Sequence, residues 1–125
     1  MTNRSQFIIK SNTNTNSIII CFGGMAKQFG QIPPFEFSNF LHQHFPNDEK
    51  HFYIDMNQCW YHKGIKGLST TIDETISCLK NEIKTFEYVT FMGVSAGGYA
   101  AILFGSKLNV NTVIAFSPPD HFKPS

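Results

Sequence analysis

The feature that most constrains the fold is a set of short apolar runs, separated by stretches with helical periodicity. Three of these runs are Ser17–Phe22, Tyr88–Met92 and Thr112–Phe116. A continuous, β-branched run such as the first is typical of a strand covered on both faces, as in a parallel sheet. Helices of about 10 to 14 residues alternate with the strands, so we expect βαβ units. The sequence therefore predicts an α/β three-layer α/β/α sandwich, with a mostly parallel sheet of about five strands.

Two helical patterns and one short strand lie between the first two runs. Apolar residues at helical spacing on the first pattern are Phe37, Phe40, Leu41 and Phe45. Residues 51–55 (HFYID) predict the short strand. The second helix is expected to begin after Thr71, because Thr71 and Glu74 have the spacing of a capping box. Its apolar face comprises Ile72, Ile76, Leu79 and Ile83.

The two ends of the chain add further elements. The polar stretch Ser11–Ser17 is rich in Asn and Thr, which bond to their own backbone and favour turns. It separates residues 7–9 from the run that begins at Ser17, so we interpret this region as strand, turn and strand, with a hairpin as one arrangement. After the apolar run Tyr88–Met92, a helix is expected from Ala96 to about Phe104, with Gly105 near its end.

Length and charge limit the classes of function. The 125 residues (14.2 kDa) suffice for one domain, which we place at 1–125, and 42% apolar residues indicate a folded core. Ten Lys and Arg against nine Asp and Glu give a formal net charge of +1. This balance lacks the strongly basic footprint of a dedicated nucleic-acid binder, so we expect no nucleic-acid partner.

The cysteines and apolar runs limit the cofactors and the compartment. Cys21, Cys59 and Cys78 are an odd number without a CxxC pair, and no HExxH spacing is present. We therefore expect neither a disulfide framework nor a metal or other cofactor, and we interpret Cys21 as a buried small apolar residue. The longest apolar run, Ile18–Phe22, is too short to span a membrane. A cytoplasmic protein without a membrane partner is the expectation.

One motif carries chemistry. Gly93-Val94-Ser95-Ala96-Gly97 matches G-x-S-x-G and lies between an apolar strand and a helix. A nucleophile at so tight a strand-to-helix turn adopts strained backbone angles, and its close neighbours collide unless they are glycine. Gly93 and Gly97 supply this clearance, so the Ser95 hydroxyl is expected to stand clear of the sheet. We interpret these two glycines as the structural residues of a nucleophile elbow.

Acyl transfer also needs two backbone N–H donors that face the developing oxyanion. One is expected to be the N–H of Ala96, at the start of a helix whose positive dipole end faces the reacting centre. The other is expected from Gly24 or Met25, because Gly23 and Gly24 end the earlier strand and let the backbone approach a substrate closely. Right-handed crossovers would bring both turns to one sheet edge, together with Ser117–His121.

These segments together resemble the α/β-hydrolase superfamily. The resemblance rests on the elbow VTFMGVSAGGYAAILFG, the strand-end turn IIICFGG and the strand VIAFSPP. The segment before the elbow, YIDMNQCWYHKGIKGLSTTIDETISCL, is similar to bacterial and viral members of unknown substrate, and the similarity covers residues 17–119. It implies Ser95 as the nucleophile, Ala96 and Gly24 as oxyanion donors, and ester, thioester or amide substrates.

The remaining members of a catalytic triad are expected at Asp120 and His121. The family's order is serine, acid and histidine, and the chain has one acid and one histidine after Ser95. Adjacent residues of an extended segment point to opposite sides, so the two do not easily serve one triad together. A histidine from a partner chain or from a missing C-terminal segment is the alternative base. His62 is interpreted as packing over an edge of the core.

The position of the elbow near the end of the sequence also bears on how many strands the domain has. The chain stops 30 residues after Ser95, so we expect a domain without the family's usual C-terminal strands. A truncated gene, a fragment of a longer chain and a degenerate paralogue are the alternatives.

Two functions from different classes follow. The first is a carboxylesterase-like serine hydrolase that acts on a small-molecule acyl substrate through Ser95. The second is a non-catalytic or degenerate hydrolase-fold domain that acts in binding or assembly. A shortened sheet has an open apolar edge, which is a template for another strand, so this second function predicts a homo-oligomer.

Overall fold

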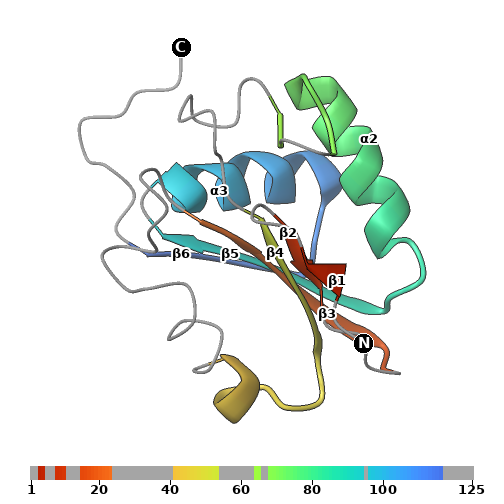
Figure 1. Cartoon of the computed structure of the whole chain (residues 1–125), viewed down its shortest axis with the longest axis vertical. Coiled ribbons are helices and arrows are strands. Elements are labelled where there is room, and N and C mark those ends of the chain that lie inside the picture. Colours follow the sequence, from red (N-terminus) through yellow and green to blue (C-terminus); the bar gives the residue numbers. More distant parts are fainter. Residues whose placement is uncertain are drawn as a thin grey trace.

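The computed structural model describes residues 3–4, 8–10, 15–23, 41–53, 64–65, 68–94 and 96–116. Within these ranges the chain forms one sheet with helices packed against it (Figure 1). The strands are β1 (Asn3–Arg4), β2 (Ile8–Lys10), β3 (Ser17–Phe22), β4 (Glu49–Tyr53), β5 (Tyr88–Val94) and β6 (Thr112–Phe116). The helices are α2 (Ile72–Ile83) and α3 (Ala96–Leu108). The chain is thus an α/β protein.

The strands lie in the order β1-β2-β4-β3-β5-β6. Strands β4, β3, β5 and β6 are parallel, whereas β2 runs antiparallel to β4 and β1 antiparallel to β2. A mostly parallel sheet is therefore confirmed, although its parallel part has four strands rather than about five. The expected hairpin is wrong, because Ile8–Lys10 pairs with His51–Tyr53, and β4 consequently separates β2 from β3.

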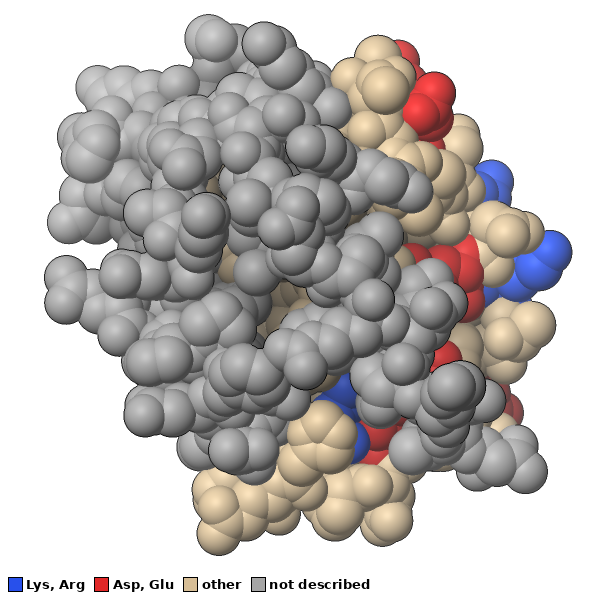
Figure 2. Space-filling model, viewed as in Figure 1, with Lys and Arg blue, Asp and Glu red and all other residues tan. Residues whose placement is uncertain are grey.

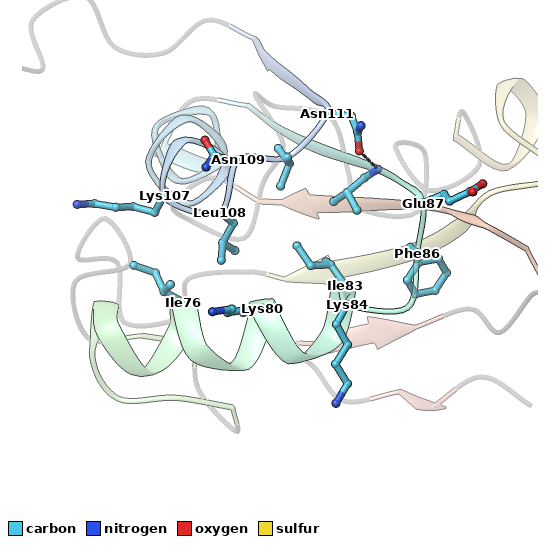
Figure 3. A pocket seen from close by; sticks show the side chains of 12 residues that line it. Ile76, Lys80, Ile83, Lys84, Phe86, Glu87, Lys107, Leu108, Asn109 and Asn111 are labelled. Atoms are coloured by element: carbon cyan, nitrogen blue, oxygen red, sulfur yellow. Dashed lines mark hydrogen bonds between the residues drawn. The ribbon is translucent and has the colours of Figure 1, made fainter.

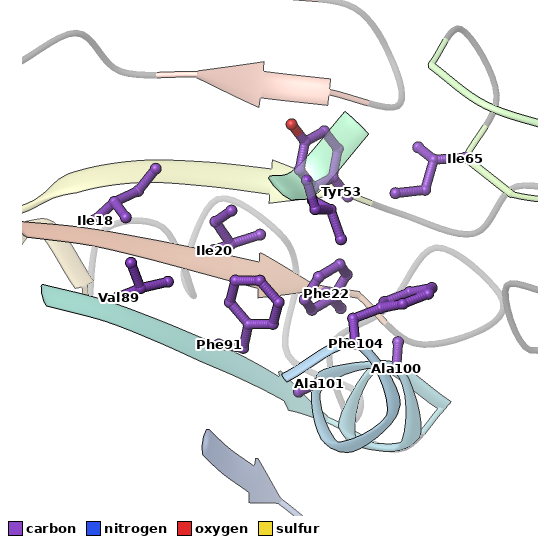
Figure 4. Close-up of a cluster of buried hydrophobic side chains, with 11 residues drawn as sticks. Ile18, Ile20, Phe22, Tyr53, Ile65, Val89, Phe91, Ala100, Ala101 and Phe104 are labelled. Atoms are coloured by element: carbon purple, nitrogen blue, oxygen red, sulfur yellow. The ribbon is translucent and has the colours of Figure 1, made fainter. Parts of the chain in front are cut away.

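The larger part of the core lies between the sheet and the helices α2 and α3, which cover the same face (Figure 1). Side chains from β3, β5 and α3 meet at Phe22, which is fully buried (Figure 4). Its ring centroid is 5.4 Å from that of Phe91 in an edge-on arrangement and 5.6 Å from that of Phe104. Aromatic pairs favour such tilted geometry, and each adds about 0.5–1.5 kcal/mol beyond its buried area.

A smaller cluster fills the opposite face of the sheet. It comprises Ile19, Cys21, Leu41, Phe52 and Met92. Leu41 belongs to a helical turn over residues 41–44, which Figure 1 shows below the sheet, on the side away from α2 and α3. Phe45, the last apolar residue of the first helical pattern, is 36% exposed, because the helical turn ends before it. The complete three-layer sandwich stays a prediction, since much of the expected helix before Leu41 lies outside the described residues.

Helix α2 begins where the sequence predicts. The Thr71 side chain accepts a hydrogen bond of 3.0 Å from the Glu74 N–H, which caps the helix. The Glu74 carboxylate accepts one of 2.9 Å from the Thr70 N–H, one residue earlier than in a regular capping box. The predicted apolar face packs on the sheet, with Leu79 fully buried and Ile72, Ile76 and Ile83 around it. The helix that this periodicity predicts is confirmed.

Helix α3 extends beyond its predicted end. It runs to Leu108, and Gly105 lies inside it rather than at its terminus. A Cβ at Gly105 would come within 2.5 Å of Val113 Cγ2, so glycine there permits close packing of α3 on β6. Asn109, the residue after the helix, has a φ of +53°, the left-handed conformation that asparagine tolerates at this position.

Candidate functional site

The carboxyl ends of the four parallel strands meet at one edge of the sheet. Phe22 at the end of β3 pairs with Tyr53 at the end of β4 and with Gly93 in β5. Val94, the last residue of β5, pairs with Phe116, the last residue of β6. The segments that follow these strands therefore leave the sheet at the same edge, where open α/β sheets bind their ligands. This is the edge at which the sequence places its candidate site.

Two glycines at the junction of β5 and α3 have no room for a side chain. A Cβ at Gly93 would overlap the Gly97 carbonyl and lie 2.7 Å from the Gly98 nitrogen. A Cβ at Gly97 would overlap the Phe22 carbonyl and lie 2.9 Å from the Gly23 carbonyl carbon. All of these obstacles are backbone atoms, which cannot rotate away as a side chain can. The first turn of α3 is thus packed directly on the end of β3.

The start of α3 adjoins this packing. Strand β5 ends at Val94 and α3 begins at Ala96, so one residue separates the two elements along the chain. Ala96 is fully buried, and as the first helical residue it contributes one of the N–H groups that lack an acceptor within the helix. The helix dipole places a partial positive charge at this end. The N-terminal end of α3 can therefore stabilise an anion that approaches the carboxyl edge of the sheet.

The hydrogen bonding at the end of β3 limits which backbone N–H can be the second oxyanion donor. The Gly23 N–H donates a hydrogen bond of 2.6 Å to the Tyr53 carbonyl, which continues the pairing of β3 with β4. This N–H is consequently used within the sheet, and a donor for a ligand must come from a later residue. The two residues named for this role, Gly24 and Met25, lie outside the described residues.

Several predicted site residues cannot be placed. Ser95, Asp120 and His121 lie outside the described residues, as Gly24 and Met25 do. Of the predicted site, the structure brings together Gly93, Gly97 and Ala96 with the end of β3. The catalytic and oxyanion roles remain predictions.

A polar cluster that the sequence analysis did not single out lies between β4 and α2. His51 is 5% exposed. Its Nε2 lies 2.6 Å from a Glu49 carboxylate oxygen, and its Nδ1 contacts a carboxylate oxygen of Glu82 on α2. The cluster therefore joins α2 to the sheet by a buried polar contact.

Tyr53 completes this cluster. Its hydroxyl donates a hydrogen bond of 2.6 Å to the Glu82 carboxylate. Burial raises the pKa of Tyr53 far above its usual range, and the charge and hydrogen bond of Glu82 raise it further, with a smaller contribution from Cys78. Glu49, His51 and Tyr53 are spaced two residues apart, so they face the same side of β4. This spacing is a signal in the sequence, but the partner Glu82 lies about 30 residues away on α2 and no local pattern connects it.

The opposite face of β4 also holds a buried charge. Lys50 is 1% exposed, and its ammonium group donates a hydrogen bond of 2.7 Å to the Asp48 carbonyl. Burial lowers the pKa of Lys50, while the charges of Asp48 and Cys21 act in the opposite direction. Cys21 is fully buried, as expected, and burial raises the pKa of its thiol far above its usual range. Such a thiol is an inert part of the core.

The described residues offer no metal centre, and their charges are mixed. No group of three or more His, Cys, Asp or Glu side chains in the described ranges is arranged to hold a metal ion. No described helix combines the length and apolar character needed to cross a membrane. Acidic and basic side chains alternate along the flank where α2 lies in the view of Figure 1 (Figure 2).

No protein-family model, no curated protein and no solved structure matches the chain. A functional assignment therefore depends on the residues and the geometry of the sheet edge.

Proposed function

We propose that the chain is a serine hydrolase-like protein that cleaves an ester, thioester or amide through Ser95. The observation that carries this proposal is the backbone packing of Gly93 and Gly97 around a one-residue step from β5 to α3. A strand-to-helix turn this tight is what a G-x-S-x-G serine needs to present its hydroxyl above a sheet. A serine in an ordinary turn would not require glycine on both sides.

The chemistry would proceed by acyl transfer. The Ser95 oxygen attacks the acyl carbon while a base takes the serine proton, and the carbonyl oxygen becomes an oxyanion. The Ala96 N–H and a second N–H from Gly24 or Met25 would stabilise that oxyanion. The leaving group departs with the proton, and water then attacks the acyl-enzyme to release the acid and restore Ser95. Each such N–H donor contributes about 3 to 4 kcal/mol of transition-state stabilisation.

The histidine that would take the Ser95 proton can be narrowed down from the described residues. Both ring nitrogens of His51 contact carboxylates, so His51 is not available to Ser95. His42 and His44 belong to an exposed turn that leads to Phe45, which lines a groove at the amino end of β3 and β5. The remaining histidines, His62 and His121, lie outside the described residues. We propose His121 as the base; Asp120, its neighbour in the chain, does not easily serve the same triad, so no acid is assigned.

Hydrolysis of an activated short-chain ester tests the proposal. The purified chain should hydrolyse the ester, and Ser95→Ala should lower kcat on the order of 10⁶-fold, to the background rate. Ser106→Ala is the matched control, because Ser106 is an exposed serine on α3 and should leave the rate unchanged. Equal rates for the Ser95→Ala variant and the unaltered chain would refute the proposal.

Two further variants identify the base. His121→Ala should abolish the activity if the base is His121, and His62→Ala should then leave it intact. The reverse result would assign the base to His62. If both variants keep full activity, the base is neither His62 nor His121. If one histidine variant is inactive, mixing it with Ser95→Ala tests whether that histidine acts from another copy of the chain, because only then does the mixture recover activity.

A second candidate function is assembly through the edge of the sheet. Strand β6 pairs with β5 on one side, and no other described strand pairs with it. Its side chains Val113 and Phe116 are 38% and 48% exposed. An unpaired edge with exposed apolar side chains is a template for a strand from another subunit.

Light scattering distinguishes the two candidates. Assembly predicts a dimer or larger oligomer that Val113→Lys converts to monomer, because a lysine on an edge strand opposes strand pairing. A monomeric chain at all concentrations would count against assembly and would leave the hydrolase proposal untouched.

A further inference from the structure

A groove at the other end of the sheet is separate from the candidate active site. It has a volume of about 580 Å³ and lies between the C-terminal halves of α2 and α3, next to the start of β5 (Figure 3). Its volume falls within the range of about 300–1,000 Å³ that is usual for small-molecule sites. Strand β5 runs from this groove to the junction with α3, so the groove and the candidate site lie at opposite edges.

The floor of the groove is apolar. Its apolar side chains include Ile76 and Ile83 from α2, Leu108 from α3, and Phe86. All four are partly exposed, so part of their apolar surface faces the groove. Burying that surface against an aliphatic chain is favourable by about 25 cal/mol per Å².

The charges are placed unevenly along the groove. Lys80 lies on the side of α2 that faces α3, and Lys107 extends from α3 on the facing wall (Figure 3). Lys84 points away from α3, and the single carboxylate of the lining, Glu87, lies at the far end from Lys80 and Lys107 (Figure 3). The three lysines are exposed, and none forms an ion pair with a residue in the described part of the chain. The groove thus has one positive end, an apolar middle and one negative end.

This polarity fits one class of ligand. We propose that the groove binds an aliphatic carboxylate, with its head group between Lys80 and Lys107 and its chain along Ile83 and Leu108. Glu87 would repel the head group from the other end and so fix the direction of binding. Lys80 and Lys107 also lie in the last turns of their helices, where cations stabilise the helix dipole. That role does not explain the open apolar floor between them. The inference is independent of Ser95 and of the proposed function.

Calorimetric titration with laurate tests the proposal, with the Ser95→Ala variant as the protein so that no acyl chemistry intervenes. We expect saturable binding at one site, weakened by added salt. The double variant Lys80→Ala/Lys107→Ala should weaken binding about tenfold, because each exposed ion pair contributes modestly. Lys84→Ala is the matched control and should leave the affinity unchanged. All three lysines are exposed, so these variants should fold.

A second probe and one spectroscopic measurement sharpen this result. Dodecyltrimethylammonium has the same chain length and the opposite charge, and it should bind more weakly than laurate. Laurate should shift the methyl NMR signals of Ile83 and Leu108 and leave the buried Ile20 unchanged. The proposal is overturned if laurate does not saturate, if the double variant binds it as tightly as the unaltered lysines do, if the cation binds equally well, or if the shifted methyls lie elsewhere.

Discussion

Helices α2 and α3 lie on the same face of the sheet but contact it in different ways. Helix α3 presents small residues, so its backbone comes directly against β3, β5 and β6. Helix α2 is held by larger side chains, with Leu79 in the core and Glu82 in a buried polar contact with His51 and Tyr53 of β4. The position of α3 is therefore fixed by steric exclusion of its backbone, whereas that of α2 depends on side-chain contacts. The helix that carries the candidate site is the one with the less adjustable contact.

The largest expected effect concerns the side-chain contact of α2. Glu82→Ala removes the carboxylate that contacts His51 and accepts from Tyr53. Two buried groups lose this carboxylate, and each buried polar group left unsatisfied costs about 1–3 kcal/mol, so we expect a loss of stability of about 4 kcal/mol. Denaturant unfolding measures it, with Glu87→Ala as the control at an exposed position. A loss below about 1 kcal/mol would mean that the cluster does not anchor α2.

The next effect concerns the backbone contact of α3. Gly97→Ala places a methyl group against the Phe22 carbonyl, and we expect a loss of about 3 kcal/mol because neither backbone can give way locally. Gly98→Ala is a matched control in the same helical turn, since its Cβ would lie 3.4 Å from the nearest atom, Ala115 Cβ. Alanine there should be neutral or stabilise the helix by up to about 1 kcal/mol. Equal unfolding midpoints for the two variants would contradict a sterically fixed α3.

The smallest effect is a pH dependence that comes from Tyr53, which donates a hydrogen bond to Glu82 of α2. Since the pKa of Tyr53 is raised in the folded state, the unfolded state releases this proton first as the pH rises above about 10. Stability should then fall with pH, by up to about 1.4 kcal/mol per pH unit from this group. Tyr53→Phe removes that contribution, so its stability should fall less steeply between about pH 9 and pH 11. Cys21 and Tyr99 also have raised pKa values, but they affect both proteins equally. Parallel curves would contradict a raised pKa of Tyr53 in the folded state.

The sequence predicts the parts of the fold that follow from local periodicity. The apolar run of β3 and the cap and apolar face of α2 are recognised because each needs only neighbouring residues. The start of β4 is missed, because Glu49 and Lys50 resemble loop residues until their distant partners are known. Gly105 is misread for a similar reason: a glycine near a helix end suggests termination, whereas its contact with Val113 explains it. The position of β2 beside β4 also depends on tertiary pairing.

The candidate site is predictable to a similar extent. The spacing of Gly93 and Gly97 indicates that neither position has room for a side chain. The described backbone agrees, because a Cβ at either glycine would overlap backbone atoms. The partners of Ser95 are harder to infer, because a base and an acid are brought to a serine by the fold rather than by spacing. The cluster around His51 illustrates this, since a buried histidine between two carboxylates could not be assigned from sequence as a structural contact.

Covalent labelling of Ser95 tests the central claim most directly. A fluorophosphonate probe phosphonylates an activated serine with loss of fluoride, and peptide mass spectrometry identifies the modified residue. The proposal predicts one adduct per chain, on Ser95, that is absent in Ser95→Ala and retained in Ser106→Ala. An unmodified Ser95 in the folded chain, or an adduct on a different serine, would contradict it.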